Sequence, residues 1–435
     1  MARDIQGWGL AWLNRFAGSA VVQRMKLNKP AEKALYQASK TGFKTAGAAN
    51  RAFKSVQKLV KPARLDKARP RDLFDLTPTD EQAMIQDTMQ RFAEERLRPA
   101  AYDADNACEA PAALLHEANE LGLAMMAVPE EMGGAATEYS AVSGVLQAAA
   151  LAQGDMGLAL ACLAPVSVAN ALSRWGTAEQ QSAYLASFLD EKPPAAALAV
   201  TEPGALFDPF VLSTTATASD DGFVLNGVKS LVPLAASAEL FLVAAKTDKG
   251  PALFILESST QGVSIEAEPA MGLRAASLGR LLLKDVKVPA AAILGGKDSF
   301  DYAEMIALSR LGLCALAVGL AQAVLDYVIP YANERKAFGE PISHRQAVAF
   351  MIANIGIEQE SMRLLTLRAA SRADQGKSFI REAALARRLC ADKGMAIGND
   401  GVQVLGGHGF VKEHPVERWY RDLRAVGVIE GSMLL

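Results

Sequence analysis

Apolar residues recur at three- and four-residue spacing in several long stretches of the chain, which predicts helices. The spacing is clearest over residues 300–333, 343–374 and 378–405, and the short connections between these stretches indicate a C-terminal four-helix bundle. Earlier, in the segment Thr77 to Gln82, a capping residue and a proline precede apolar residues at helical spacing, so a helix begins there. Further helices are expected to about residue 189.

Between these helical regions the pattern changes to short apolar runs. Such runs lie at residues 197–200, 223–225, 240–243 and 253–256. Turn signals separate them at Asp221-Gly222, Asn226-Gly227 and Lys249-Gly250, which predicts a small antiparallel β domain with a hairpin at Asn226-Gly227. The fold class is therefore α+β, with an N-terminal helical domain (73–194), a central β domain (195–296) and a C-terminal helical bundle (297–435) after an arm (1–72).

One apolar stretch is long enough to raise the question of a membrane span. Residues 156–173 carry no charge over 18 positions. Pro165, Ser167 and Asn170 interrupt the stretch, and Asp155 and Arg174 close it. This pattern favours a buried core helix over a membrane-spanning one.

Composition narrows the class of protein. The 435 residues are 51% hydrophobic and 21% charged, which is typical of a soluble globular protein with much buried helix. The four cysteines form no CxxC pair and the four histidines no HExxH motif, so we expect neither a disulfide framework nor a metal site, and we favour a reducing compartment. No GxGxxG or GxxxxGK[ST] motif supports a Rossmann or P-loop nucleotide site.

Charge is distributed unevenly along the chain. Residues 1–71 hold 16 Lys or Arg against 3 Asp or Glu, a net charge of +13, whereas the rest holds 29 against 45, a net charge of -16. The basic arm carries Trp8, Trp12 and Phe16, so an anionic membrane surface, nucleic acid and the acidic body of the chain are all candidate partners. No nucleic-acid-binding module is found, so we expect no nucleic acid partner. Peripheral membrane contact through residues 1–60 at a cytoplasmic location is one expectation, and a transit peptide to the mitochondrial matrix is the alternative.

Five local motifs occur in order along the body of the chain: residues 127–134 (AVPEEMGG), 199–203 (AVTEP), 226–229 (NGVK), 333–342 (NERKAFGEPI) and 403–410 (QVLGGHGF). An Arg-Asp-x-Arg segment follows the last of them at residues 421–424. Together they resemble the acyl-CoA dehydrogenase family of flavoproteins, and the resemblance runs from about residue 73 to 435. The basic arm lies outside it.

The resemblance implies FAD as cofactor and at least a homodimer or homotetramer. Guanidinium groups pair well with a pyrophosphate, and glycines let a backbone approach a dinucleotide closely, so the chemistry of these residues suits the role. Thr201 would meet the flavin ring, and the other positions would hold the adenosine diphosphate end of FAD across a subunit boundary or lie beside the catalytic segment. These other cofactor-binding candidates are Arg335, Phe338, Gln346, Gln403, Gly406, Gly407 and Ser432.

The resemblance also implies a reaction. Forming a double bond between the α and β carbons of a thioester needs a base for the α-proton and a hydride acceptor, and the segment Val428 to Ser432 places Glu430 on the family's catalytic base. Burial in an apolar stretch would strengthen such a carboxylate as a base. The implied substrate is an acyl-CoA, the product a trans-2-enoyl-CoA, and the electron acceptor an electron-transferring flavoprotein.

Three departures from the family pattern leave other functions open. Within residues 205–208, Leu206 and Phe207 stand where the family has a small flexible residue and a hydroxyl near the pyrophosphate. Leu231 and Pro233 stand where the family has an aromatic residue that covers the flavin and a threonine. The sequence stops five residues after Glu430, where the family continues in a helix that contacts FAD, so either fewer residues hold the cofactor or a downstream part is missing. A catalytically weak or inactive flavin-fold protein acting as an assembly partner, and an acyl-CoA oxidase-like enzyme, are the alternatives.

Overall fold

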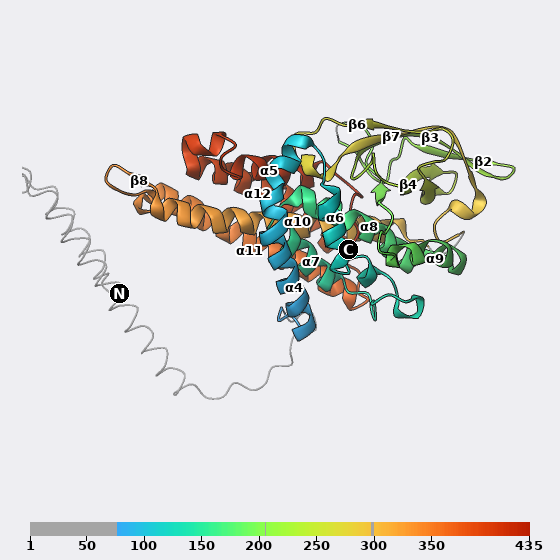
Figure 1. The fold of residues 1–435 in the computed structure, drawn as a ribbon, viewed down its shortest axis with the longest axis horizontal. Helices are drawn as coiled ribbons and strands as arrows, with labels where there is room; N and C mark the ends of the chain where they lie inside the picture. Colours follow the sequence, from blue (N-terminus) through green and yellow to red (C-terminus); the bar gives the residue numbers. More distant parts are fainter. Residues whose placement is uncertain (1–75, 205, 297–299) are drawn as a thin grey trace, which may run out of the picture. The chain divides into compact units, whose positions relative to one another are not determined.

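The computed structural model describes residues 76–204, 206–296 and 300–435, all within the unit Phe74–Leu435. The predictions for residues 1–72 lie outside the described residues. The architecture is a helical N-terminal domain, a central β domain and a C-terminal helical domain (Figure 1). This order confirms the fold class predicted from the sequence.

The N-terminal domain begins at the helix start expected from its capping residues. Thr79 Oγ1 accepts a hydrogen bond from the Gln82 backbone N–H at 3.2 Å, and the Gln82 side chain accepts one from the Thr79 N–H at 3.0 Å. This reciprocal capping satisfies two backbone donors at the helix end. The helices of this domain are α4 (Asp80–Phe92), α5 (Arg98–Ala107), α6 (Ala112–Glu120), α7 (Ala141–Ala152), α8 (Met156–Trp175) and α9 (Ala178–Tyr184).

Two described helices, α8 and α10 (Tyr302–Glu334), are long and apolar enough to cross a membrane by length and composition. Protein covers 89% of the most apolar window of α8 and 72% of that of α10. As predicted, α8 is therefore a buried core helix, and Asp155 caps its first turn by accepting the Leu158 N–H at 3.0 Å.

The β domain is a seven-stranded sheet with strand order β1-β4-β2-β3-β7-β6, and β5 also pairs with β4. Its strands are β1 (Ala196–Ala199), β2 (Thr215–Ser219), β3 (Gly222–Val232), β4 (Leu240–Thr247), β5 (Gly250–Glu257), β6 (Val263–Ala267) and β7 (Gly279–Pro289). Most pairings are antiparallel, as expected, but β1 and β2 run parallel to β4. The sheet is therefore mixed at this edge.

The hairpin predicted at Asn226-Gly227 is wrong. Both residues lie inside β3, at a register shift in its pairing with β7. Gly227 has φ 152°, and a Cβ there would lie 2.5 Å from Thr214 Oγ1, so the position needs glycine for close packing. The Asn226 side chain meanwhile pairs with Asp285 of β7 at 3.2 Å, which explains the turn-like sequence without a turn.

The C-terminal domain contains the three long helices predicted from the sequence, α10, α11 (Gln346–Asp374) and α12 (Ile380–Leu405). Figure 1 shows α11 and α12 running side by side, with the short helix α13 (Val416–Leu423) following α12 in the chain. The small hairpin β8 (Lys336–Ala337) and β9 (Glu340–Pro341) connects α10 to α11.

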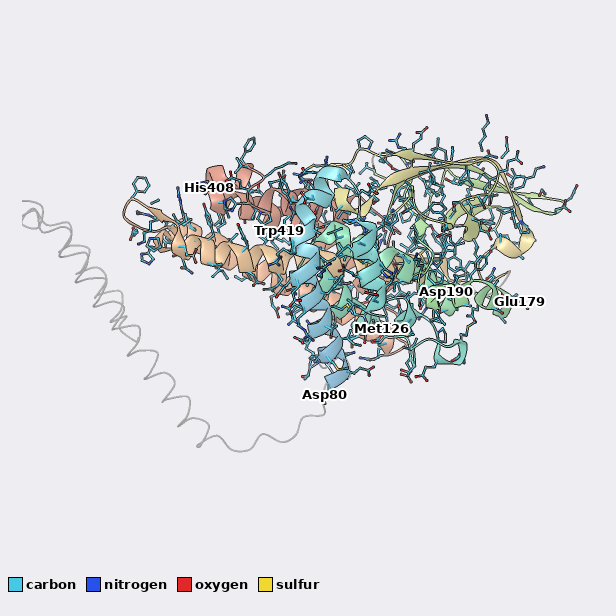
Figure 2. The ribbon with its side chains drawn as sticks, in the orientation of Figure 1. Asp80, Met126, Glu179, Asp190, His408 and Trp419 are labelled. Atoms are coloured by element: carbon cyan, nitrogen blue, oxygen red, sulfur yellow. The ribbon has the colours of Figure 1, made fainter. Side chains whose placement is uncertain are left out.

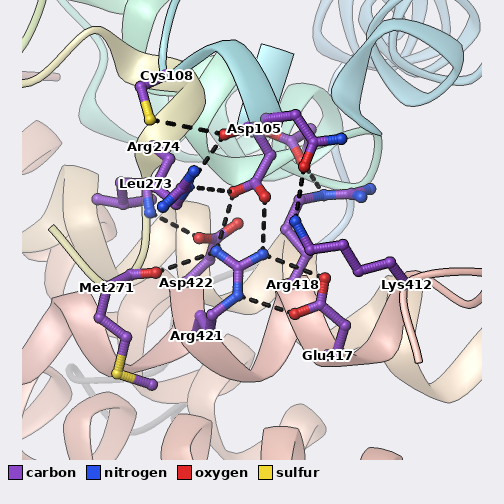
Figure 3. Close-up of polar contacts among 12 residues, drawn as sticks. Asp105, Cys108, Met271, Leu273, Arg274, Lys412, Glu417, Arg418, Arg421 and Asp422 are labelled. Carbon is purple, nitrogen blue, oxygen red and sulfur yellow. Dashed lines mark hydrogen bonds and ion pairs between the residues drawn. The ribbon is translucent and has the colours of Figure 1, made fainter. Parts of the chain in front are cut away.

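Helix α13 joins the three domains through ion pairs and hydrogen bonds (Figure 3). Arg421 pairs with Asp105 of α5 at 2.8 Å, and Arg418 pairs with Asp155 at 3.0 Å. Arg421 also donates to the Met271 carbonyl of the β domain at 3.0 Å, and Asp422 accepts the Leu273 N–H at 2.6 Å. The loop after β6 is therefore fastened to α13 from two sides.

The Asp422 carboxyl is buried, whereas aspartate side chains are mostly exposed in folded proteins. Burial, reinforced by the negative charge of Asp155, raises the pKa of Asp422 to about 8, although the Leu273 N–H and the guanidinium groups of Arg421 and Arg418 lower it. Burial likewise raises the pKa of Asp155. Because the pKa of Asp422 in the folded chain lies above its ordinary value, its ionisation opposes folding, and stability is lost as the pH rises towards 8.

We expect Asp422→Asn to remove this pH dependence. The amide stays neutral and keeps an oxygen for the Leu273 N–H, so the variant should gain at least about 2 °C in melting temperature over the wild type between pH 6 and pH 9. Thermal melts across this pH range measure the effect, with the exposed Asp392→Asn on α12 as control. Parallel melting curves of Asp422→Asn and the wild type would show that Asp422 does not titrate in this way.

Candidate functional site

Glu430 lies in the segment that follows α13 and is buried, with 5% of its surface exposed. Its backbone is held by one side chain, because the Thr201 hydroxyl donates to the Glu430 carbonyl at 2.7 Å and accepts the Glu430 N–H at 3.0 Å. Gly431 follows with φ 64°, and a Cβ there would lie 2.3 Å from Val200, so the backbones of the two segments lie close together. The end of β1 thus fixes the position of Glu430.

Two arginines from different helices contact the Glu430 carboxylate. Arg310 of α10 donates from Nη2 to Oε1 at 3.0 Å and from Nε to Oε2 at 3.0 Å. Arg387 of α12 donates from Nε to Oε1 at 2.9 Å. The expected burial of Glu430 is found, but the expected apolar surroundings are wrong, because two guanidinium groups form ion pairs with its carboxylate.

A buried ion pair supports the loop that carries Thr201. Lys229 Nζ contacts Glu202 at 2.8 Å and the Val200 carbonyl at 3.1 Å, and the other Glu202 contacts include the Ser213 N–H at 2.7 Å. Burial lowers the pKa of Lys229 to about 8 against the opposing effect of Glu202. Burial raises the pKa of Glu202. The Lys229 ion pair and the hydrogen bonds to Glu202 lower the pKa by more than burial raises it, so the net shift is downward.

A crevice of about 440 Å³ lies between the β domain and the C-terminal helices, next to this segment. Its volume falls in the range of small-molecule sites, and most of its lining is apolar. Residues from β3, the loop after β6, α12 and the segment after α13 face it, namely Leu231, Met271, Met395, Arg424, Val428 and Ile429. Because Val428 and Ile429 directly precede Glu430, the crevice wall and the buried carboxylate belong to one short segment.

The end of β3 offers few free polar groups to this crevice. The Leu231 N–H and the Ser230 hydroxyl both donate to Glu268 at 2.8 Å, and Pro233 has no N–H. Burial raises the pKa of Glu268, but these hydrogen bonds and the Arg280 ion pair lower it below its ordinary value. Glu268 therefore occupies the donors that β3 would otherwise direct outward.

A second set of predicted residues lies at the far end of the bundle and is exposed. Arg335 ends α10, Phe338 is 96% exposed with φ 56°, and Gln346 begins α11. At Gly406 and Gly407 no atom lies within 4 Å of an added Cβ, so both glycines leave open space for a ligand. The polar backbone of this turn is accessible, as binding a dinucleotide requires.

Tyr331 ties these two exposed segments together. Its hydroxyl donates to the Leu405 carbonyl at 3.4 Å and is hydrogen-bonded with His408 Nδ1 at 2.9 Å. Figure 2 labels His408 at the end of the bundle that also carries the hairpin β8 in Figure 1. The structure therefore brings the Arg335 and Gly406 segments to one end of the molecule, as the sequence motifs imply.

The predicted site residues thus form two groups. Thr201, Glu430 and Ser432 are buried together where α10, α12 and the β domain meet, whereas the other group lies at the exposed bundle end with Gln403. In the part of the chain that the structure describes, no hydrogen bond or ion pair joins the groups. Sequence reasoning missed Arg310 and Arg387, because their partner lies more than 40 residues away in each case.

Comparisons with known proteins agree with this arrangement. Models of the N-terminal, middle and C-terminal domains of acyl-CoA dehydrogenases match residues 79–192, 197–286 and 302–433. The chain belongs to the acyl-CoA dehydrogenase family. The enzyme is therefore an oxidoreductase.

Individual relatives align with most of this chain. The mitochondrial short-chain specific acyl-CoA dehydrogenase of Bos taurus is 36% identical over 80% of this chain and 86% of its own. The structure of butyryl-CoA dehydrogenase from Megasphaera elsdenii matches 82% of this chain and 96% of its own at 31% identity, with a TM-score of 0.75. An FAD complex of PigA matches over the same shares at 26% identity, also with a TM-score of 0.75.

The family identifies FAD as the cofactor, and the residues present fit it. The apolar crevice suits a flat ring system, and the open backbone at Gly406 and Gly407 suits the dinucleotide end. The flavin contact expected of Thr201 has no free donor, because its hydroxyl hydrogen goes to the Glu430 carbonyl, and the Leu231 N–H goes to Glu268. The ring edge would therefore find fewer donors from these elements than the motifs imply.

Proposed function

We propose that this enzyme removes the α and β hydrogens of a short acyl-CoA thioester to form a trans-2-enoyl-CoA, with Glu430 as the base for the α-proton. The observation that carries the proposal is the buried Glu430, which follows Val428 and Ile429 in the chain, and these two residues line the crevice that suits a flavin ring. Bound FAD supplies the hydride acceptor. An electron-transferring flavoprotein would then take the electrons.

The residues around Glu430 prepare it for this task. Thr201 holds its backbone from both the N–H and the carbonyl side, and two guanidinium groups fix the orientation of its carboxylate. Burial keeps water away from the carboxylate, so an incoming thioester would meet it without competition. Leu231, Met271 and Met395 would pack on the ring and the acyl group in the crevice.

A short acyl chain is favoured by packing beside the base. Met433 fills the space over Gly312 of α10, where an added Cβ would lie 3.1 Å from its Cγ. Leu434 is fixed by the Ser167 hydroxyl, which accepts its N–H at 2.9 Å, and is 2% exposed. These side chains occupy the interior between α8 and α10, which leaves little depth for a long chain. The resemblance to short-chain and butyryl-CoA enzymes points the same way.

Anaerobic titration of the FAD-loaded protein with butyryl-, octanoyl- and palmitoyl-CoA tests the proposal. We expect the flavin absorbance to bleach with butyryl-CoA at the lowest concentration. Glu430→Gln should slow the bleaching by about 10²- to 10⁴-fold, because it removes the base. Glu430→Asp keeps the charge for both arginines and withdraws the carboxylate by one methylene, so it should fold normally and still be slow.

The outcomes separate the competing functions. Normal bleaching in Glu430→Gln would contradict the role of Glu430. Loss of bleaching with every thioester, although FAD is bound, would favour an inactive assembly protein. After reduction, faster reoxidation by oxygen than by an electron-transferring flavoprotein would favour the oxidase-like alternative.

We further propose that each FAD is shared between two subunits of a homodimer or a homotetramer. Arg310 and Arg335 lie on the same helix 25 positions apart, which at 1.5 Å per residue separates them by about 37 Å. Arg310 contacts Glu430, whereas Arg335 lies with the open glycines. This separation exceeds the reach of one extended dinucleotide, so the two groups of one chain would serve different FAD molecules.

Mixing two inactive variants tests this sharing. Glu430→Gln and Arg335→Ala homodimers should each be nearly inactive, the second through weak FAD binding. In a heterodimer, one site receives Glu430 from one subunit and Arg335 from the other, so a re-equilibrated equal mixture should recover about a quarter of wild-type activity. Recovery no greater than the sum of the separate variants would contradict the shared site.

We also propose that residues 1–60 bind the surface of an anionic membrane, with a cytoplasmic location and the mitochondrial matrix as the alternative. The support is the sequence: Trp8, Trp12 and Phe16 precede a run of Lys and Arg.

Deletion of residues 1–60 should abolish sedimentation with phosphatidylglycerol vesicles, because the basic and aromatic residues of the arm are lost. Phosphatidylcholine vesicles serve as the neutral control and should bind neither form. Equal partition of the deleted and full-length proteins into anionic vesicles would exclude the arm as the membrane contact.

A further inference from the structure

The hydrogen bonds to the Glu430 carboxylate are distributed unevenly between its two oxygens. Oε1 accepts Arg310 Nη2 at 3.0 Å and Arg387 Nε at 2.9 Å, and the one Arg310 Nε hydrogen lies farther from it than from Oε2, at 3.2 Å. Oε2 accepts only Arg310 Nε at 3.0 Å among the described residues. Because each carboxylate oxygen has two lone pairs, Oε1 is saturated and Oε2 keeps capacity for one more proton.

The two arginines differ in what else they hold. Arg387 also donates to the Val426 carbonyl, and from Nη2 to the Ile429 carbonyl at 3.1 Å, so it grips the backbone of the segment that lines the crevice. The described hydrogen bonds of Arg310 all go to Glu430, and its guanidinium lies 6.0 Å from the Phe210 ring. Arg387 therefore connects α12 to the base and to the wall, whereas Arg310 acts on the carboxylate.

Resting on the function proposed for Glu430, we propose that Arg310 and Arg387 are positioning residues with separate tasks. Together they saturate Oε1 and leave Oε2 as the oxygen that takes the substrate α-proton. Arg387 in addition fixes the distance between the carboxylate and the crevice wall, because one guanidinium group bonds Oε1 and the Ile429 carbonyl. Arg310 orients the carboxylate and has no part in holding the wall.

The charges support this division of tasks. The side chains of Arg310 and Arg387 are 20% and 13% exposed, and that of Glu430 is 6% exposed. Removing one arginine leaves the carboxylate paired with the other, so a single variant buries no unpaired charge and should fold. Removing both would leave Glu430 without a cation, so the double variant is not informative.

Single variants separate the two tasks. Arg310→Met should lower kcat about 100-fold through a misplaced carboxylate, with KM and the dissociation constant of FAD within about 2-fold of the wild type. Arg387→Met should lower kcat similarly and also weaken FAD binding about 10-fold, because two backbone carbonyls of the wall lose their donor. The dissociation constant of FAD is measured by flavin fluorescence, without turnover.

The control is Arg388, the next residue on α12. It is exposed and has no hydrogen-bond or ion-pair partner among the described residues. Arg388→Met should therefore leave kcat, KM and FAD binding unchanged. Thermal melts and circular dichroism of all variants exclude a general loss of structure.

Chemical rescue distinguishes positioning from a purely structural role. Arg387→Ala leaves a space of guanidinium shape, so free guanidinium ion should restore part of the lost kcat. Ammonium at the same ionic strength should not, because a point charge cannot bond the carboxylate and both carbonyls at once. A structural defect would not respond to either ion.

The results that overturn the inference are distinct from those that overturn the function. Wild-type kcat in Arg310→Met or Arg387→Met, with Glu430→Gln inactive, would reject only the positioning roles. Weakened FAD binding in Arg310→Met, or unchanged FAD binding in Arg387→Met, would reject the division of tasks. Full activity in Glu430→Gln would reject the proposed function together with this inference.

Discussion

The structure depends on the buried ion pairs that helix α13 makes with the other domains. Arg421 and Arg418 reach Asp105 and Asp155 in the N-terminal domain, and Asp422 holds the β domain at Leu273. The crevice lies between the β domain and the C-terminal helices, so its width is set by these contacts. Buried charges hold a geometry well when each has a partner, because any relaxed arrangement would leave one unpaired.

Much of the fold follows from signals that act within a few residues. The Thr79 cap, the long apolar periodicities and the turn at Lys249-Gly250 all concern neighbours in sequence, and each is found where the pattern predicts it. Asn226-Gly227 led to a wrong prediction, because the same dipeptide suits both a tight turn and a bulge. The close packing of Thr214 against Gly227 is what favours the bulge here. Local chemistry could not reveal that distant contact.

The site was only half predictable for the same reason. Glu430, Thr201 and the glycines at 406 and 407 were singled out through motifs, which are patterns of neighbouring residues. Arg310 and Arg387 were not predicted, because nothing in the sequence around an arginine in a long helix indicates a partner 120 or 43 positions away. The apolar residues around Glu430 in sequence suggested an apolar site, and the charges came from other helices.

The polar contacts around the base form one connected path through the β domain. Lys229 pairs with Glu202, Lys229 also holds the Val200 carbonyl, and the neighbouring Thr201 holds the Glu430 backbone. Each of these groups is buried, so losing any one would leave its neighbour with one partner fewer in a medium of low dielectric constant. The base is therefore oriented from two directions, by β1 and β3 at its backbone and by α10 and α12 at its carboxylate. Such a constraint tolerates change at Leu231 and Pro233, because neither belongs to the path that holds Glu430.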